Sequence, residues 1–134
     1  MKQVEHIGIA VKDLELAIAH YSTLLNTPCY KREEVESQQV TTAFFQLKDQ
    51  KIELLAATSV ESPIAKFIQR SGEGIHHLAF EVDDIEKEMK RLIQEGFEPL
   101  QKQPFKGADN KMVAFFHPKT THGVLIEICQ DIQE

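Results

Sequence analysis

The sequence predicts an α+β fold made of two copies of one module, each a strand, a helix and three further strands. Three observations carry this prediction: an internal repeat, segments in which apolar and polar residues alternate, and helix-capping residues at the same place in both copies. The chain has 134 residues, about the length of one domain. We therefore expect a single domain over residues 1–134.

The repeat becomes visible when the sequence is shifted by 71 positions. Residues 6–15, HIGIAVKDLE, then lie on residues 77–86, HLAFEVDDIE. The same shift places 43–45 on 114–116, and residues 51–57 resemble 123–129. Several matches in one order indicate a duplicated unit. We expect modules over about 1–58 and 72–134, joined by a helix near 62–71.

The elements of the first module follow from periodicity and capping. Residues 3–11 alternate as a strand, and Asp13 caps a helix that ends near Leu25. Strands are expected near 29–36, 39–47 and 51–57. Ser62 and Pro63 then begin the short linking helix, since proline suits the first helical position.

The second module repeats this order. A strand is expected at 74–82, and Asp84 caps a helix that ends near Glu95, with Gly96 just past it. Further strands are expected near 97–102, 111–117 and 123–129. Neither sheet alone can cover its apolar face, so the two modules should share one α+β domain.

Composition excludes several classes of protein. The chain has 15 Lys and Arg against 21 Asp and Glu, a formal net charge of −6, which argues against a general nucleic-acid binder. No apolar run approaches the ~20 residues of a membrane span, so no membrane partner is expected. Cys29 and Cys129 lie among apolar neighbours, which favours packed, reduced thiols and a cytoplasmic protein.

Four side chains of metal-ligand type occupy matching positions of the repeat. His6 and His77 lie in the first strand of each half, and Glu53 and Glu127 lie among aliphatic residues in the last. A mid-strand carboxylate is costly unless it is solvated, paired or bound to a metal. An edge strand that exposes its glutamate to water could explain one such residue. It explains less well two glutamates at matching positions of a repeat that also carries two matching histidines. Two imidazoles and two carboxylates suit Zn, Mn, Co, Ni or Fe(II).

The other histidines are weaker candidates for metal ligands. His76 should face away from His77 and pack in the core or behind the ligands. His20, His117 and His122 are expected to be structural or exposed. The loop 107–111 is rich in turn residues but lacks the ending of a phosphate-binding P-loop.

Five stretches carry a resemblance to a known family: 6–21, 51–57, 62–68, 72–86 and 117–130. On them the chain resembles the vicinal oxygen chelate superfamily, which includes glyoxalase I, extradiol dioxygenases and the fosfomycin and bleomycin resistance proteins. Within it, the chain looks most like the methylmalonyl-CoA epimerases. The stretches SPIAKFI and GEGIHHLAFEVDDIE are the more specific ones.

The resemblance implies paired βαβββ modules whose mixed sheet curls around a metal-binding cleft. It implies that His6, His77 and Glu127 are metal ligands. The fourth ligand of the epimerase pattern is often glutamine, and the matching position here is Glu53. The cofactor is then a divalent ion such as Co, Mn, Zn or Ni.

The resemblance also implies a reaction, the interconversion of (R)- and (S)-methylmalonyl-CoA through an enolate. Inversion needs a proton-transfer group on each face of the substrate. Some family members carry a glutamate where this chain has Thr42, so we expect Glu127 and Glu53 to transfer the protons. Lys111 and Lys119 are candidates for contacts with the CoA phosphates, although surface lysines are the simpler interpretation.

The sequence leaves other functions open. A glyoxalase I-type lyase, acting on a glutathione hemithioacetal, needs the same ligands. A metal-free drug-binding protein should lack the full ligand set and have an aromatic lining, whereas this chain has all four ligands and no Trp. A dioxygenase pattern uses two histidines and one carboxylate. Homodimers are common in the superfamily, so a homodimer is expected.

Overall fold

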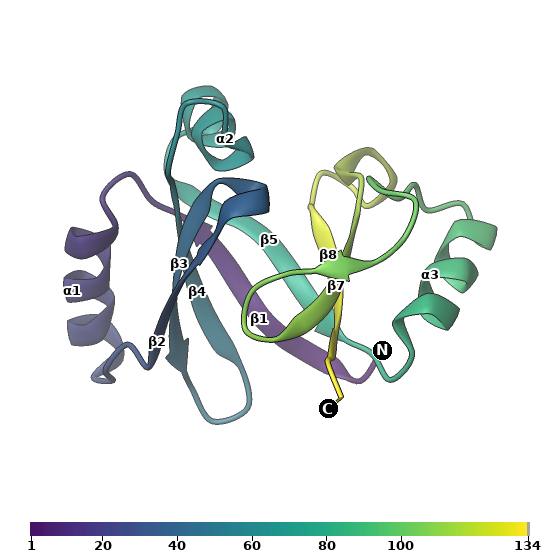
Figure 1. Cartoon of the computed structure of the whole chain (residues 1–134), viewed down its shortest axis with the longest axis horizontal. Coiled ribbons are helices and arrows are strands. Elements are labelled where there is room, and N and C mark those ends of the chain that lie inside the picture. Colours follow the sequence, from purple (N-terminus) through teal and green to yellow (C-terminus); the bar gives the residue numbers. More distant parts are fainter. Residues whose placement is uncertain (134) are drawn as a thin grey trace. The chain divides into compact units, whose positions relative to one another are not determined.

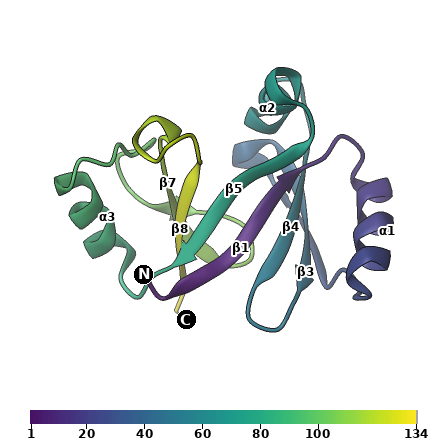
Figure 2. The ribbon, with the colours of Figure 1, turned by 180° about the vertical axis from the view of Figure 1, so that it is seen from behind.

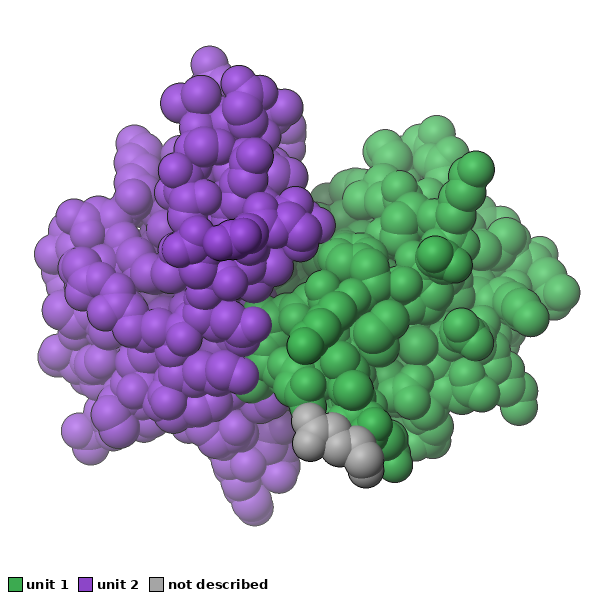
Figure 3. All heavy atoms as spheres, in the orientation of Figure 1, with its two compact units in different colours: residues 1–5, 77–134 green, residues 6–76 purple. Residues whose placement is uncertain are grey.

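The computed structural model describes residues 1–133, which form two compact units (Figure 3). We call His6–His76 the N-terminal unit, and Met1–Glu5 together with the chain from His77 onward the C-terminal unit. The chain passes from one unit to the other inside strands β1 (Gln3–Ala10) and β5 (Gly74–Glu81). The prediction of one domain, with module limits near 58 and 72, stays a prediction.

Four strands form the sheet of the N-terminal unit, in the order β2-β3-β4-β1 (Figure 1). β2 spans Lys31–Val35, β3 spans Val40–Gln46 and β4 spans Lys51–Ala57. β1 is parallel to β4, and the other two pairings are antiparallel. A 3-10 turn at Glu36–Gln38 joins β2 to β3.

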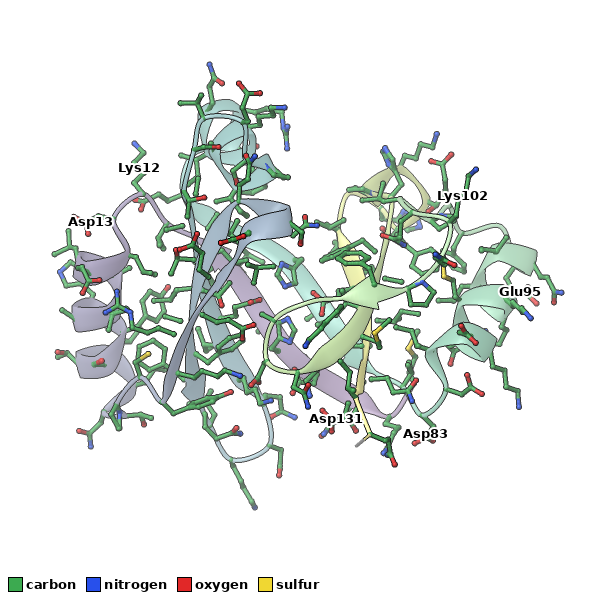
Figure 4. The ribbon with its side chains drawn as sticks, in the orientation of Figure 1. Lys12, Asp13, Asp83, Glu95, Lys102 and Asp131 are labelled. Carbon is green, nitrogen blue, oxygen red and sulfur yellow. The ribbon has the colours of Figure 1, made fainter. Side chains whose placement is uncertain are left out.

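One face of this sheet packs against helix α1 (Leu14–Leu25). The Asp13 side chain accepts a hydrogen bond from the Leu16 N–H at 3.0 Å and so caps the first turn (Figure 4). Asn26 ends the helix in the left-handed conformation, with φ 51°. Phe45 and Leu54 are fully buried beneath α1.

The opposite face is apolar at one end, where helix α2 (Pro63–Ser71) packs on it through Ile64. Ser62 caps α2 by accepting a hydrogen bond from the Ile64 N–H at 3.1 Å, as the Ser-Pro signal predicts. Ala10, Val40 and Leu55 complete this cluster. Because side chains alternate along a strand, this face also carries the residues two positions away from them.

The C-terminal unit repeats the arrangement with the strand order β5-β8-β7-β6. Figure 2 labels β5, β8 and β7 of this unit. β6 is Phe105–Lys106, β7 is Lys111–Phe116 and β8 is Ile126–Asp131. β5 is parallel to β8, and the other pairings are antiparallel. A 3-10 turn, Pro118–Thr120, lies between β7 and β8.

Helix α3 (Ile85–Gln94) packs on one face of these four strands. The Asp84 side chain accepts from the Lys87 N–H at 3.1 Å, which is the bond that Asp13 makes at the start of α1. Met89 and Leu92 face the sheet and contact the cluster that contains Phe116 and Ile128. The two units therefore share one module, and the predicted α+β class with repeated βαβββ units is confirmed.

Two predicted strands differ from the structure. Residues 97–102 form no strand, and only Pro99 makes an isolated bridge, to Phe116. Pro99 lies within this segment and has no N–H to donate, so the hydrogen bonds of Leu100 to Phe115 and of His117 to Glu98 do not extend into a ladder. The next strand begins at Phe105. The last strand begins at Ile126 instead of 123, because Gly123 is still in a turn with φ 89°.

Among residues 1–133, no helix combines the length and the apolar character needed to cross a membrane.

Candidate metal centre

The N-terminal unit contains a buried histidine–glutamate pair. His6 Nε2 lies 3.3 Å from Glu53 Oε1, and both residues are 5% exposed. Their strands are parallel neighbours, with Gly8 of β1 in register with Glu53 of β4. His6 lies two residues before Gly8, so its side chain projects from the same face as Glu53. The aliphatic neighbours Ile52 and Leu54 project from the other face and pack with α1.

The C-terminal unit contains the same pair in the same register. His77 Nε2 lies 3.2 Å from Glu127 Oε1, and both side chains are buried. Ala79 of β5 is in register with Glu127 of β8, and His77 lies two residues before Ala79. The repeat in the sequence is therefore a repeat of two ligand-type groups on two adjacent parallel strands.

A phenylalanine lies across the ladder from each glutamate. Phe44 of β3 is opposite Glu53, and Phe115 of β7 is opposite Glu127. The Phe115 ring meets His77 edge to face, with ring centroids 5.8 Å apart. Such rings remove water from the carboxylates, and a desolvated carboxylate gains most from a cation or a proton.

A buried charged cluster lies in the C-terminal unit, on the same side of β7 as Phe115. Lys111 Nζ makes an ion pair with Asp131 and lies 3.9 Å from Glu5 Oε2. Lys111 and Glu5 are both buried, while Asp131 is exposed at the end of β8 (Figure 4). The interpretation of Lys111 as a surface lysine is therefore wrong, because its ammonium is neutralised inside the unit. Lys119 is exposed and pairs with Glu98 at 2.9 Å.

The remaining histidines pack on another ring, cap a turn or are exposed, and both cysteines are free. His76 packs edge to face on Phe67 of α2, with ring centroids 4.9 Å apart. His117 accepts a hydrogen bond from the Lys119 N–H at 3.0 Å and caps the second 3-10 turn. His20 and His122 are exposed. Both cysteines are free thiols, Cys129 buried and Cys29 half-buried.

One carboxylate of this region was not among the predicted site residues. Glu33 of β2 is directly opposite Thr42 of β3, and opposite residues of an antiparallel pair share a face. Val35, two residues further along β2, packs with Val40 and Leu55 on the face that carries Glu53. The alternation of side chains over residues 31–35 indicates a strand in the sequence. Which face of the sheet carries Glu33, however, depends on the register of β2 with β3.

Comparison with known proteins places this geometry in a family. A model of the glyoxalase/bleomycin resistance protein/dioxygenase superfamily matches residues 5–115. An ethylmalonyl-CoA/methylmalonyl-CoA epimerase of Cereibacter sphaeroides is 38% identical over 130 residues, covering 96% of this chain and 97% of that protein. The chain belongs to this superfamily, in its methylmalonyl-CoA epimerase family.

Further relatives agree with this assignment. The mitochondrial methylmalonyl-CoA epimerase of Homo sapiens is 36% identical over 129 residues, which are 96% of this chain and 73% of that protein. A variant of the Streptomyces coelicolor methylmalonyl-CoA epimerase, solved in complex with 2-nitronate-propionyl-CoA, superposes with a TM-score of 0.96. Its sequence is 29% identical, and the match covers 99% of each chain. The predicted family is thus confirmed.

Proposed function

We propose that this chain is a divalent-metal-dependent epimerase that interconverts (R)- and (S)-methylmalonyl-CoA. The observation that carries the proposal is its 38% identity, over nearly the whole of both chains, to an ethylmalonyl-CoA/methylmalonyl-CoA epimerase. The buried histidine–glutamate pairs supply the chemistry that such a reaction needs. The substrate is therefore an acyl-CoA whose C2 lies between a thioester and a carboxylate.

The proposed metal ligands are His6 and Glu53 from the N-terminal unit, with His77 and Glu127 from the C-terminal unit. One pair alone offers two donor atoms, fewer than a catalytic divalent site normally takes from a protein. Four donors, two imidazoles and two carboxylates, match the preference of Zn, Co, Mn and Ni. Their burial supports this assignment, because buried carboxylates are stabilised when they coordinate a metal.

When bound, the ion would supply electrostatic stabilisation of the negative charge that develops on the substrate oxygens. The protein has to move protons. Removing the C2 proton leaves its electron pair in the enolate, and inversion needs a proton returned from the opposite side. The sequence predicts Glu127 and Glu53, one buried carboxylate from each unit, for these transfers.

Assembly and location complete the proposal. We propose a homodimer in the cytoplasm, because homodimers are common in the superfamily and both cysteines are free thiols. Size-exclusion chromatography with light scattering tests the assembly: a mass twice that of the 15.3 kDa chain supports it, and a monomer contradicts it.

The reaction is tested by polarimetry of single epimers. One epimer of methylmalonyl-CoA is incubated with metal-loaded protein, and a glutathione hemithioacetal is assayed in parallel. Epimerisation of the CoA thioester with no lyase activity supports the proposal. Lyase activity without epimerisation would instead support a glyoxalase I-type function with the same ligands.

A further inference from the structure

The face of the N-terminal sheet that carries His6 and Glu53 holds a second carboxylate, that of Glu33. Glu33 lies opposite Thr42, and Thr42 in turn lies opposite Leu55 of β4. The next row on this face is formed by Lys31, Phe44 and Glu53. Glu33 and Glu53 are thus two strands and one two-residue step apart, roughly 12 Å between their backbones at ordinary sheet spacings.

The surroundings of these two glutamates differ. The Glu53 side chain is 7% exposed and contacts the buried imidazole of His6. The Glu33 side chain is 30% exposed, and its Oε1 lies 3.4 Å from Lys31 Nζ. This lysine limits where the carboxylate can point. The Glu33 carboxylate is therefore in contact with solvent, whereas that of Glu53 is shielded from it.

Glu53 also has a competing task in the proposed site. A carboxylate oxygen that coordinates a metal has to leave the ion before its lone pair can accept a proton. Glu127 carries the same double task in the other unit, so a carboxylate with no ligand role on this side spares one of the two proton transfers that step. Thr42, which lies between Glu33 and Leu55 in this row, is 1% exposed and donates its hydroxyl to the Glu33 carbonyl oxygen at 3.4 Å. Its hydroxyl is no base for a carbon acid.

We infer that Glu33, and not Glu53, is the proton-transfer residue of the N-terminal unit. This inference rests on the proposed function. In one direction the C2–H bond breaks, the proton goes to a Glu33 carboxylate oxygen, and the electron pair is delocalised in the enolate. A proton from the carboxyl group of the second base, Glu127, then forms the new C–H bond on the other side. In the reverse direction the two residues exchange roles.

The experiment follows both epimers separately in D₂O. Proton NMR measures deuterium entry at C2, and polarimetry measures conversion. In a two-base enzyme, loss of one base stops conversion but leaves exchange with retention at the face of the other base. We therefore expect Glu33→Gln to lower conversion by about 10²–10⁴-fold. Deuterium exchange into one epimer should stay within about threefold of the wild-type rate, after the exchange measured without enzyme is subtracted.

Glu34→Gln is the matched control. Glu34 is the next residue of β2, is exposed, and faces the other side of the sheet opposite Thr41. This variant should convert both epimers at the wild-type rate. A second variant, Thr42→Glu combined with Glu33→Gln, places a carboxylate at the register partner and should restore part of the conversion.

The outcomes separate this inference from the proposed function. A wild-type protein that converts neither epimer contradicts the proposed function itself. An active wild-type protein with Glu33→Gln conversion equal to that of Glu34→Gln overturns only the role of Glu33. Equal loss of conversion and of exchange for both epimers, with an unchanged circular dichroism spectrum, also overturns it, because a missing base affects one face only.

Discussion

Glu127 Oε1 lies 3.2 Å from His77 Nε2 across two adjacent parallel strands, and both residues are almost completely buried. His6 and Glu53 repeat this relationship at 3.3 Å in the other unit. A duplicated βαβββ module thus places one imidazole and one carboxylate on the same sheet face twice. The repeated pair, together with the family, is the basis of the predictions below.

The two pairs should bind one metal ion together. We expect one divalent ion per chain by elemental analysis, since each pair supplies only two donors. His6→Ala and His77→Ala, which remove a donor from different units, should each weaken binding of the same ion in calorimetric titrations. Two ions per chain, with each variant losing one of them, would show that the pairs act independently.

Replacement of Glu53 should affect the metal more than the chemistry. Glu53→Gln keeps an oxygen donor of the same size but removes its charge and its basicity. We expect weaker metal affinity, with conversion at saturating metal within about tenfold of the wild-type rate, well short of the loss that removal of a general base causes. A loss of 10²-fold or more at saturating metal, of the order expected for a lost general base, would return the proton-transfer role to Glu53.

Stability should depend on the two helix-covered cores. Phe116 is 1% exposed beneath α3, so Phe116→Ala should lower the free energy of unfolding by about 3–5 kcal/mol. Leu24 on α1 is 72% exposed, and Leu24→Ala should change the free energy of unfolding by less than about 0.5 kcal/mol. Urea denaturation followed by circular dichroism measures both. Equal effects would mean that α3 does not pack as described.

Glu88 should titrate below its ordinary range. A hydrogen bond from the Arg91 side chain is the main cause of the lowered pKa of Glu88, and the N-terminal ammonium at 3.4 Å adds to it. Because the folded pKa is depressed, the ionised form stabilises the fold. That contribution to stability is present above the pKa of a glutamate in the unfolded chain. It is lost as the pH falls through the pKa of Glu88 in the folded protein. NMR titration should find the shift and its reduction in Arg91→Met.

Much of the fold was predictable from local signals. Asp13, Ser62 and Asp84 each cap the helix predicted for them, because capping depends on a few neighbouring atoms. The two buried histidine–glutamate pairs could be picked out in the sequence because the duplication repeats these residues in matching strands, and their role as metal ligands stays a prediction. Strand pairing depends on distant residues, and there the prediction failed: residues 97–102 alternate like a strand, yet Pro99 prevents a ladder.

In the sequence, Glu33 was missed and Lys111 was misread for the same physical reason. Glu33 looks like one charge in a polar segment, and only its register opposite Thr42 identifies its face. Lys111 looks like a surface lysine in sequence, but β7 places it beside Asp131 and Glu5. Neither environment follows from adjacent residues: that of Glu33 depends on the register of the β2–β3 hairpin, and that of Lys111 depends on Asp131 and Glu5, which belong to other strands.

The proposed function depends on metal-dependent proton abstraction at C2 of methylmalonyl-CoA. Proton NMR in D₂O tests it directly, with the protein loaded with Co²⁺ or Mn²⁺ and a chelator-treated sample as control. We predict C2 deuteration above the uncatalysed background together with conversion between epimers, both lost on chelation and restored by metal. A protein that binds its metal stoichiometrically and yet exchanges no C2 proton would contradict the proposed function.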